Sequence, residues 1–189
     1  LKIDRRFTHL LTQAGNAISW FHLLYLPEKI EPWMVYLQAI MSRSRTKELI
    51  SFCHRFALAP KQRRRLIQQK TDAEKIALEM LKRPSIKPSE TYWLLNGLDN
   101  EALLYLMTIA RKRFIQKAVS KYVTTWSNVS PQLSGDELKT MGYTPGPQFK
   151  MMLNHLIEAQ LDGHINTKEE AVALIRRTYN PATPPRTRP

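Results

Sequence analysis

Two pairs of carboxylates are the strongest candidates for metal-assisted chemistry: Asp72 with Glu74, and Asp99 with Glu101. Carboxylates held close together can bind magnesium against a phosphate group. Both pairs, however, stand where helices are expected to begin, and acidic side chains there are stabilised by the positive end of the helix dipole. We therefore interpret them as helix-capping residues and predict no catalytic residue.

The five histidines and the single cysteine complete no metal or nucleophile motif. No two histidines have the spacing of a zinc site. Cys53 and His54 are neighbours, so on a helix their side chains point about 100° apart and cannot easily act together. The sequence also has no glycine-rich phosphate-binding loop. It predicts neither a metal site nor a self-contained active site.

A glycine–proline turn, Gly142-Tyr143-Thr144-Pro145-Gly146-Pro147, could contact a phosphate. The N–H groups at the start of a helix bind anions, and we expect Thr144 to cap a helix whose first residue is Pro145. Because the prolines remove two N–H donors, the Gly146 N–H and the Thr144 hydroxyl could contact one phosphate at most. The glycines would let an RNA backbone approach closely. Tyr143 is the aromatic residue expected to stack on a base. The same pattern also fits a plain connection between two helices.

Positive charge dominates the composition, with 29 Lys and Arg against 16 Asp and Glu, a net charge of +13 and a pI near 10.0. An excess of this size indicates a polyanionic partner, nucleic acid before an anionic membrane. Three clusters carry much of it: Lys61, Arg63, Arg64 and Arg65; Arg111, Lys112, Arg113, Lys117 and Lys121; Arg176 and Arg177. No apolar run approaches the roughly 20 residues needed to span a bilayer. One cysteine excludes an internal disulfide framework, and we expect a cytoplasmic protein.

Apolar residues recur at helical spacing along most of the chain. The sequence predicts an all-α fold, an irregular bundle of about eight to ten helices. Capping boxes at Thr71/Glu74, Ser134/Glu137 and Thr167/Glu170 predict three helix starts. The first of them would end a helix over 60–69 and begin another that runs to about Lys82. Four regions are expected: 1–83, connecting helices over 84–130, a C-terminal group of helices over 131–179, and a disordered tail over 180–189.

The motifs of residues 131–179 carry a family resemblance. They are Leu133-Ser134-Gly135-Asp136-Glu137-Leu138, the glycine–proline turn, a helix ending at Asp162-Gly163, and Thr167-x-Glu-Glu-Ala. This combination resembles the tail of bacterial tRNA nucleotidyltransferases, the CCA-adding and A-adding enzymes, and their poly(A) polymerase relatives. A softer match over 16–83, including Trp20-Phe21 and Trp33-Met34-Val35-Tyr36-Leu37, is similar to the body region of the long bacterial forms.

The resemblance implies a C-terminal portion of such an enzyme. In that family a catalytic head, which uses Mg and ATP or CTP, comes first, and the body and tail grip the tRNA. The head's acidic motif and the neck's nucleotide-selecting motif have no counterpart here, so the chain would hold RNA without adding nucleotides. Its partners would be tRNA or another RNA and the head of the same protein. The resemblance puts Gly135, Lys139, Gly142, Gly146 and Lys150 against the tRNA backbone.

Two other functions remain open from the sequence. A DNA-binding module of helix–hairpin–helix type also uses a glycine turn to meet phosphates. A helical protein-interaction or dimerisation domain could carry its positive charge incidentally.

Overall fold

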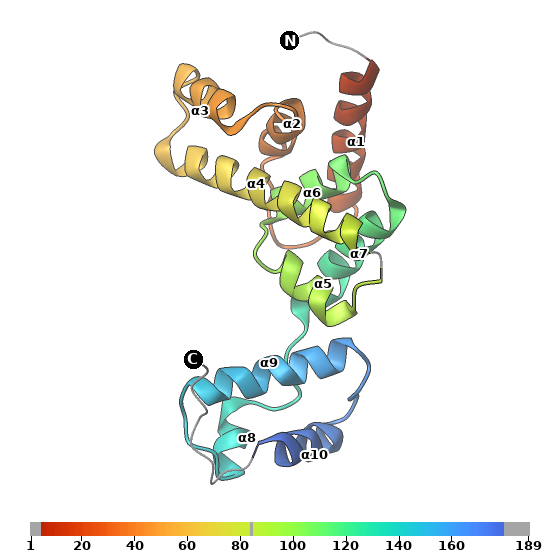
Figure 1. Ribbon diagram of the computed structural model, residues 1–189, viewed down its shortest axis with the longest axis vertical. Coiled ribbons are helices and arrows are strands. Elements are labelled where there is room, and N and C mark those ends of the chain that lie inside the picture. Colours follow the sequence, from red (N-terminus) through yellow and green to blue (C-terminus); the bar gives the residue numbers. More distant parts are fainter. Residues whose placement is uncertain (1–4, 84, 180–189) are drawn as a thin grey trace. The chain divides into compact units, whose positions relative to one another are not determined.

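The computed structural model describes residues 5–83 and 85–179, with side chains from Phe7 onward (Figure 1). This part of the chain contains ten α-helices, one short 3₁₀-helix (Trp126–Asn128) and no strand, so the predicted all-α fold is confirmed. The chain divides into two compact units. Unit 1 comprises residues 1–86 and 93–124, and unit 2 comprises 87–92 and 125–189. The tail predicted over 180–189 lies outside the described residues.

Unit 1 is built around one central helix. Its helices are α1 (Arg5–His22), α2 (Pro32–Ile40), α3 (Thr46–Arg55), α4 (Pro60–Lys82), α6 (Asn100–Ile109) and α7 (Arg113–Thr124). Residues 101–106 of α6 are all buried, and α6 packs against α1, α2, α4 and α7. A helix that is buried on all sides belongs at the centre of a core. Helices from the predicted region 1–83 and helices α6 and α7 from the predicted region 84–130 therefore share one core.

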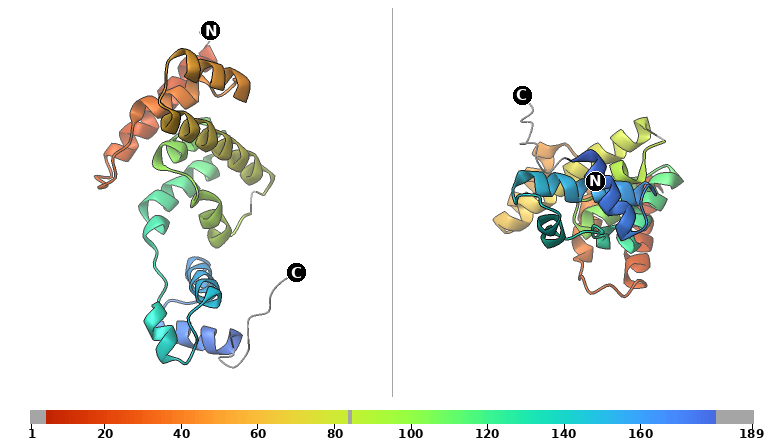
Figure 2. Two further views of the ribbon diagram at one scale, coloured as in Figure 1. Left: turned by 90° about the vertical axis from the view of Figure 1, so that its left-hand side faces the viewer. Right: turned by 90° about the horizontal axis from the view of Figure 1, so that it is seen from below.

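Helix α4 is one continuous helix of 23 residues, so the predicted break near Thr71 is wrong. Figures 1 and 2 both show it running alongside α6. Buried Leu66, Ala73, Ile76 and Met80 continue its apolar face through the expected break. The Thr71 hydroxyl donates to the Ile67 carbonyl oxygen at 2.8 Å instead of capping a new helix. Burial of this face against the core outweighs a local capping signal.

Helices α3 and α4 close a smaller apolar cluster at one end of unit 1. Its buried members are Met34, Met41, Leu49, Cys53 and Leu66. Burial raises the pKa of the Cys53 thiol, which keeps it protonated near neutral pH. The cluster holds α3 against the first half of α4 and thereby positions the basic residues of both helices.

Unit 2 packs three helices around its own core. They are α8 (Gly135–Thr140), α9 (Pro147–Leu161) and α10 (Lys168–Thr178), with Leu138, Met152, Leu156 and Ile175 among the fully buried side chains. The Ser134 and Thr167 capping boxes are both present, as predicted. Helix α5 (Pro88–Leu95) contributes its first residues to this unit, where the Ser89 N–H and hydroxyl donate to the Asp162 carboxylate at 2.9 and 2.8 Å.

Candidate nucleic-acid interface

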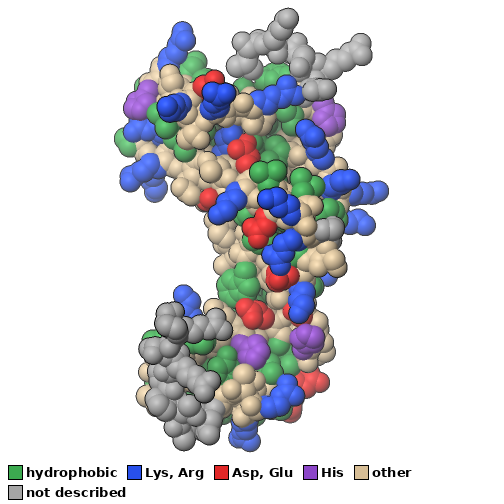
Figure 3. All heavy atoms as spheres, in the orientation of Figure 1, with side chains coloured by type: hydrophobic (Ala, Val, Ile, Leu, Met, Phe, Trp, Pro, Cys, Tyr) green, Lys and Arg blue, Asp and Glu red, His purple; other side chains and the backbone are tan. Residues whose placement is uncertain are grey.

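The basic surface of unit 1 begins with a stretch that has no acidic residue. Between Glu48 and Asp72 the chain carries six Lys and Arg residues and no Asp or Glu. The structure places these residues on the second half of α3 and the first half of α4. Of this set Arg55, Lys61 and Arg64 are exposed. Figure 3 shows Lys and Arg side chains at this end of unit 1 and also over the rest of its visible face.

Arg63 and His54 join the two helices across this surface. The Arg63 guanidinium lies 3.2 Å from Nδ1 of His54, an exposed contact between α4 and α3. His54 and Arg55 were not among the predicted site residues. The missed signal was the absence of acids over 49–71, which is readable in the sequence and extends beyond the cluster at 61–65.

Arg65 has a different role from its neighbours, and its predicted place among the RNA-binding residues needs correction. Its guanidinium donates to Asp99 at 2.6 Å, to Glu31 at 2.9 Å and to Glu101 at 2.5 Å. Burial lowers the pKa of Arg65, but the hydrogen bond to Asp99 and the three negative charges outweigh burial and raise it. Because the guanidinium is committed to three carboxylates, it has little capacity left for a phosphate.

Other carboxylates of unit 1 are also engaged within the protein. Glu74 accepts from Lys70 Nζ at 2.7 Å and from the Tyr105 hydroxyl at 2.6 Å. Glu79 pairs with Arg83. Asp99 caps α6 by accepting from the Ala102 N–H, as predicted. Within the acid-free stretch, Arg65 and Lys70 are therefore paired with carboxylates, whereas Arg55, Lys61 and Arg64 are exposed.

The capping interpretation of the other acidic pair is wrong. Asp72 and Glu74 lie in the middle of α4, where Asp72 accepts from the Gln68 side-chain amide at 2.8 Å. In the part of the chain that the structure describes, no three His, Cys, Asp or Glu side chains group as a metal site requires. No described helix is both long and apolar enough to cross a membrane.

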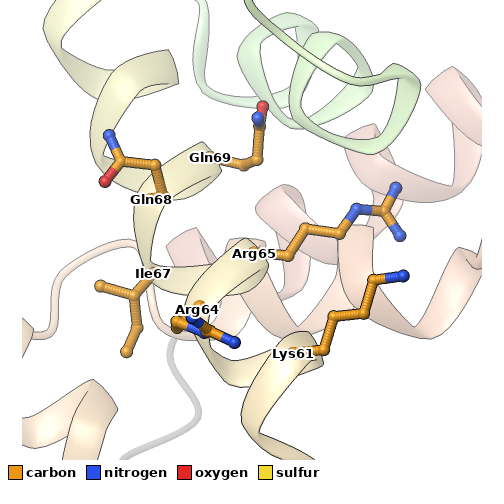
Figure 4. Close-up of a pocket in the computed structure, with 6 residues that line it drawn as sticks. All are labelled: Lys61, Arg64, Arg65, Ile67, Gln68 and Gln69. Atoms are coloured by element: carbon orange, nitrogen blue, oxygen red, sulfur yellow. The ribbon is translucent and has the colours of Figure 1, made fainter.

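A shallow hollow opens along the first half of α4 (Figure 4). It is lined by Lys61, Arg64, Arg65, Ile67, Gln68 and Gln69. Gln69 is held by the Gly97 carbonyl oxygen and the Asp99 N–H, and Gln68 by Asp72. With Arg65 also engaged, Lys61 and Arg64 supply the cationic groups available to an anion here.

The second basic cluster follows the exposed face of α7. Arg113 and Lys117 are exposed, and so is Lys121 one turn further on. The opposite face of the helix buries Ile115 and Val119 in the core. The spacing of four residues therefore produces the separate basic face that the sequence predicts.

In unit 2, the glycine–proline turn is exposed but differs from its predicted form. Helix α9 begins at Pro147 with Gly146 as its N-cap, so Thr144 does not cap it. Gly142 has φ +91°, a conformation that favours glycine, and Thr144 and Gly146 face solvent. The turn exposes its backbone, and the first turn of α9 contains one proline, Pro147, instead of the two that the predicted start would include.

Tyr143 is buried, and its predicted stacking role is wrong. Its side chain is 5% exposed within the core of unit 2, and its hydroxyl donates to the Tyr179 carbonyl oxygen at 2.7 Å. Burial raises the pKa of the Tyr143 phenol. A ring enclosed in this way cannot receive a base, since the turn folds it beneath the helices instead of outward.

The remaining predicted residues of unit 2 lie in mixed charge. Lys139 is exposed but bonded to Asp136 at 2.6 Å, while Lys150 is exposed on α9. Gly135 begins α8, and a Cβ added there would meet the Phe149 ring at an ordinary 3.7 Å. Nearby, the hydrogen bond from Lys168, with those from Ser134, lowers the pKa of Glu137 to about 2. Asp136 and Glu137 therefore neutralise part of the positive charge around this turn.

The fold and the sequence of this chain are similar to those of tRNA nucleotidyltransferases. No protein-family model matches the chain. Over 178 residues it is 32% identical to the A-adding tRNA nucleotidyltransferase of Geobacter sulfurreducens, covering 92% of this chain and 20% of that enzyme. The chain thus spans about one fifth of the length of this relative. The predicted resemblance to tRNA nucleotidyltransferases is confirmed.

Solved structures show the same fold at low sequence identity. The Thermotoga maritima CCA-adding enzyme complexed with tRNA superposes with a TM-score of 0.74 at 17% identity, over 94% of this chain and 42% of that one. A CCA-adding enzyme in its apo form II superposes with a TM-score of 0.71 at 16% identity, and the match covers 93% of this chain and 41% of that one. A CCA-adding enzyme with CTP superposes with a TM-score of 0.67 at 18% identity, and the match covers 93% of this chain and 41% of that one.

Proposed function

We propose that this chain binds tRNA and holds it so that its 3′ end reaches a nucleotide-adding head domain. The observation that carries the proposal is the basic surface of α3 and α4, where exposed Arg55, Lys61 and Arg64 have no acidic residue beside them in sequence. Acidic residues of the same unit form ion pairs with Arg65 and Lys70 or cap a helix.

The relatives supply the kind of nucleic acid. The related sequence belongs to an enzyme named for A-addition to tRNA, and one structural neighbour is a CCA-adding enzyme bound to tRNA. By this likeness, the chain would read the shape and phosphates of a folded RNA, since duplex RNA offers side chains little access to its bases. Fixing the body of the tRNA would confine its 3′ end near the reaction centre and reduce the entropic cost of the chemical step.

Salt dependence provides the direct test. Each phosphate neutralised by Lys or Arg releases counterions, so tRNA affinity should fall at least about tenfold between about 50 and 200 mM salt. We would measure the binding of a labelled tRNA to the full 189-residue chain by fluorescence anisotropy. No binding at low salt, or binding that salt does not weaken, contradicts the proposal.

Competition separates tRNA from the alternatives. Unlabelled tRNA should displace the labelled tRNA at lower concentration than duplex DNA of equal length. Equal competition would favour the helix–hairpin–helix alternative. A stable oligomer by light scattering, together with no affinity for either nucleic acid, would favour the protein-interaction alternative.

A further inference from the structure

We infer that Phe56 is a stacking platform for a nucleobase of the bound RNA. The inference rests on the proposed function and adds a base contact to the phosphate contacts described above. It assigns a role to a residue whose helical spacing with Leu49, Phe52 and Cys53 predicts burial, whereas the structure exposes it.

The geometry holds an aromatic ring firmly at the surface. Phe56 follows the last residue of α3, and the residue is 61% exposed. Its ring stacks on Phe52, with centroids 4.4 Å apart and planes 30° apart, and Phe52 packs against the apolar cluster of unit 1. The chain turns sharply at the next residue, Ala57, which has φ +51°. An apolar ring this exposed gains little from folding, yet Phe52 supports it from behind.

The charge around the ring indicates which partner would cover it. His54 and Arg55 precede Phe56 directly, and Arg63 contacts His54 from α4. Lys61 and Arg64 lie on the first turns of the same helix. Single-stranded segments of RNA bind where aromatic side chains stack on bases and cations neutralise the adjoining phosphates. An aromatic ring inside an acid-free basic stretch provides both features.

Comparison with another exposed apolar residue of the same unit sharpens the assignment. Leu78 on α4 is also 61% exposed, but it has no π face and lies between Glu74 and Glu79 in sequence. It therefore has neither the stacking surface nor the electrostatic setting. This makes Leu78 a matched control for the loss of exposed apolar area.

The test measures tRNA affinity for the full chain carrying Phe56→Ala, Phe56→Leu, Phe56→Trp or Leu78→Ala. Removing a stacked aromatic should weaken binding about 5- to 100-fold. Phe56→Leu should weaken it similarly, because leucine keeps apolar area without a π face, whereas Phe56→Trp should retain it. Leu78→Ala should bind like the wild type. The slope of log affinity against log salt should not change in any variant, since every variant keeps all of the lysines and arginines that face phosphates.

Several outcomes would overturn the inference. If Phe56→Ala binds tRNA with the affinity of the wild type, the ring does not stack on a base of the RNA, and another partner, such as a protein, would cover it. Full rescue by Phe56→Leu would indicate a nonspecific apolar contact instead of stacking. Thermal unfolding of each variant identifies any that misfold, and Phe56→Trp, which keeps an aromatic ring, then remains a folded comparison. If the wild type itself fails to bind tRNA, the proposed function fails, and that result differs from a failure confined to Phe56.

Discussion

Two adjacent arginines on α4 carry the same charge and have different surroundings. Arg64 is exposed and lines the shallow hollow. Arg65 is bonded to Glu31, Asp99 and Glu101, and the Glu101 side chain is only 3% exposed. Figure 4 shows their side chains leaving the helix in different directions. A step of one residue, about 100° around the helix, therefore separates a residue that stabilises unit 1 from one that is available to a ligand.

Arg65→Ala should destabilise unit 1 by about 2–4 kcal/mol, because it leaves the buried Glu101 carboxylate without its cation. Arg64→Ala is the matched control and should change stability by no more than about 0.5 kcal/mol. Urea unfolding followed by circular dichroism measures both values. Arg64→Ala should instead weaken tRNA binding. Equal effects of the two substitutions on stability would contradict the assignment.

At the scale of elements, the starts of α6, α8 and α10 carry side-chain caps, whereas α2, α4 and α9 begin at a proline without one. Thr167 accepts from the Glu170 N–H, and Glu170 bonds back to the Thr167 N–H, so α10 begins with a complete capping box. Thr144 has the same residue type in a similar sequence setting, yet α9 begins three residues later at Pro147. Thr167 and Thr144 thus allow a direct comparison of a threonine that caps a helix with one that does not.

Thr167→Ala should cost about 1 kcal/mol of stability in unit 2, the usual loss for a Thr N-cap. Thr144→Ala should stay within about 0.5 kcal/mol of the wild type, because its exposed hydroxyl does not cap α9. Thermal unfolding of the two variants gives the comparison. A larger loss from Thr144→Ala than from Thr167→Ala would mean that α9 begins earlier than described.

At the scale of the whole molecule, function depends on where positive charge remains unpaired. The net charge is +13, but the acids are unevenly spread. The first half of α4 has none, whereas its second half carries Asp72, Glu74 and Glu79. Positive potential should therefore concentrate at one end of the helix, although both halves carry lysine or arginine.

Neutralising charges on the two halves of α4 tests this distribution. Lys61→Gln with Arg64→Gln should reduce the salt slope of tRNA binding by about 1 to 2, because each cation removed leaves one phosphate fewer neutralised. Lys75→Gln with Lys82→Gln removes the same charge from exposed positions of the same helix. This control should leave the slope nearly unchanged, and equal slopes for both double variants would contradict a localised interface.

The candidate site could be predicted from the sequence only in part. The basic cluster at 61–65 and the exposed turn at 142–147 were recognisable because charge, glycine and proline are local properties. The sequence could not predict that Arg65 is engaged within the protein, since its three carboxylate partners lie 34 to 36 residues away along the chain. The burial of Tyr143 could not be predicted for the same reason, because its hydroxyl donates to the carbonyl oxygen of Tyr179, which lies 36 residues further along the chain.

The sequence by itself determined the all-helical class, two of three proposed capping boxes, the excess of positive charge and the resemblance to tRNA nucleotidyltransferases. These follow from periodicity, local hydrogen-bonding chemistry and composition. Only the tertiary structure decided that α4 runs unbroken, that Arg65 is bound to three carboxylates and that Phe56 faces solvent. Each of these depends on contacts between helices, and such contacts determine which side chains of a basic chain are buried, paired or exposed.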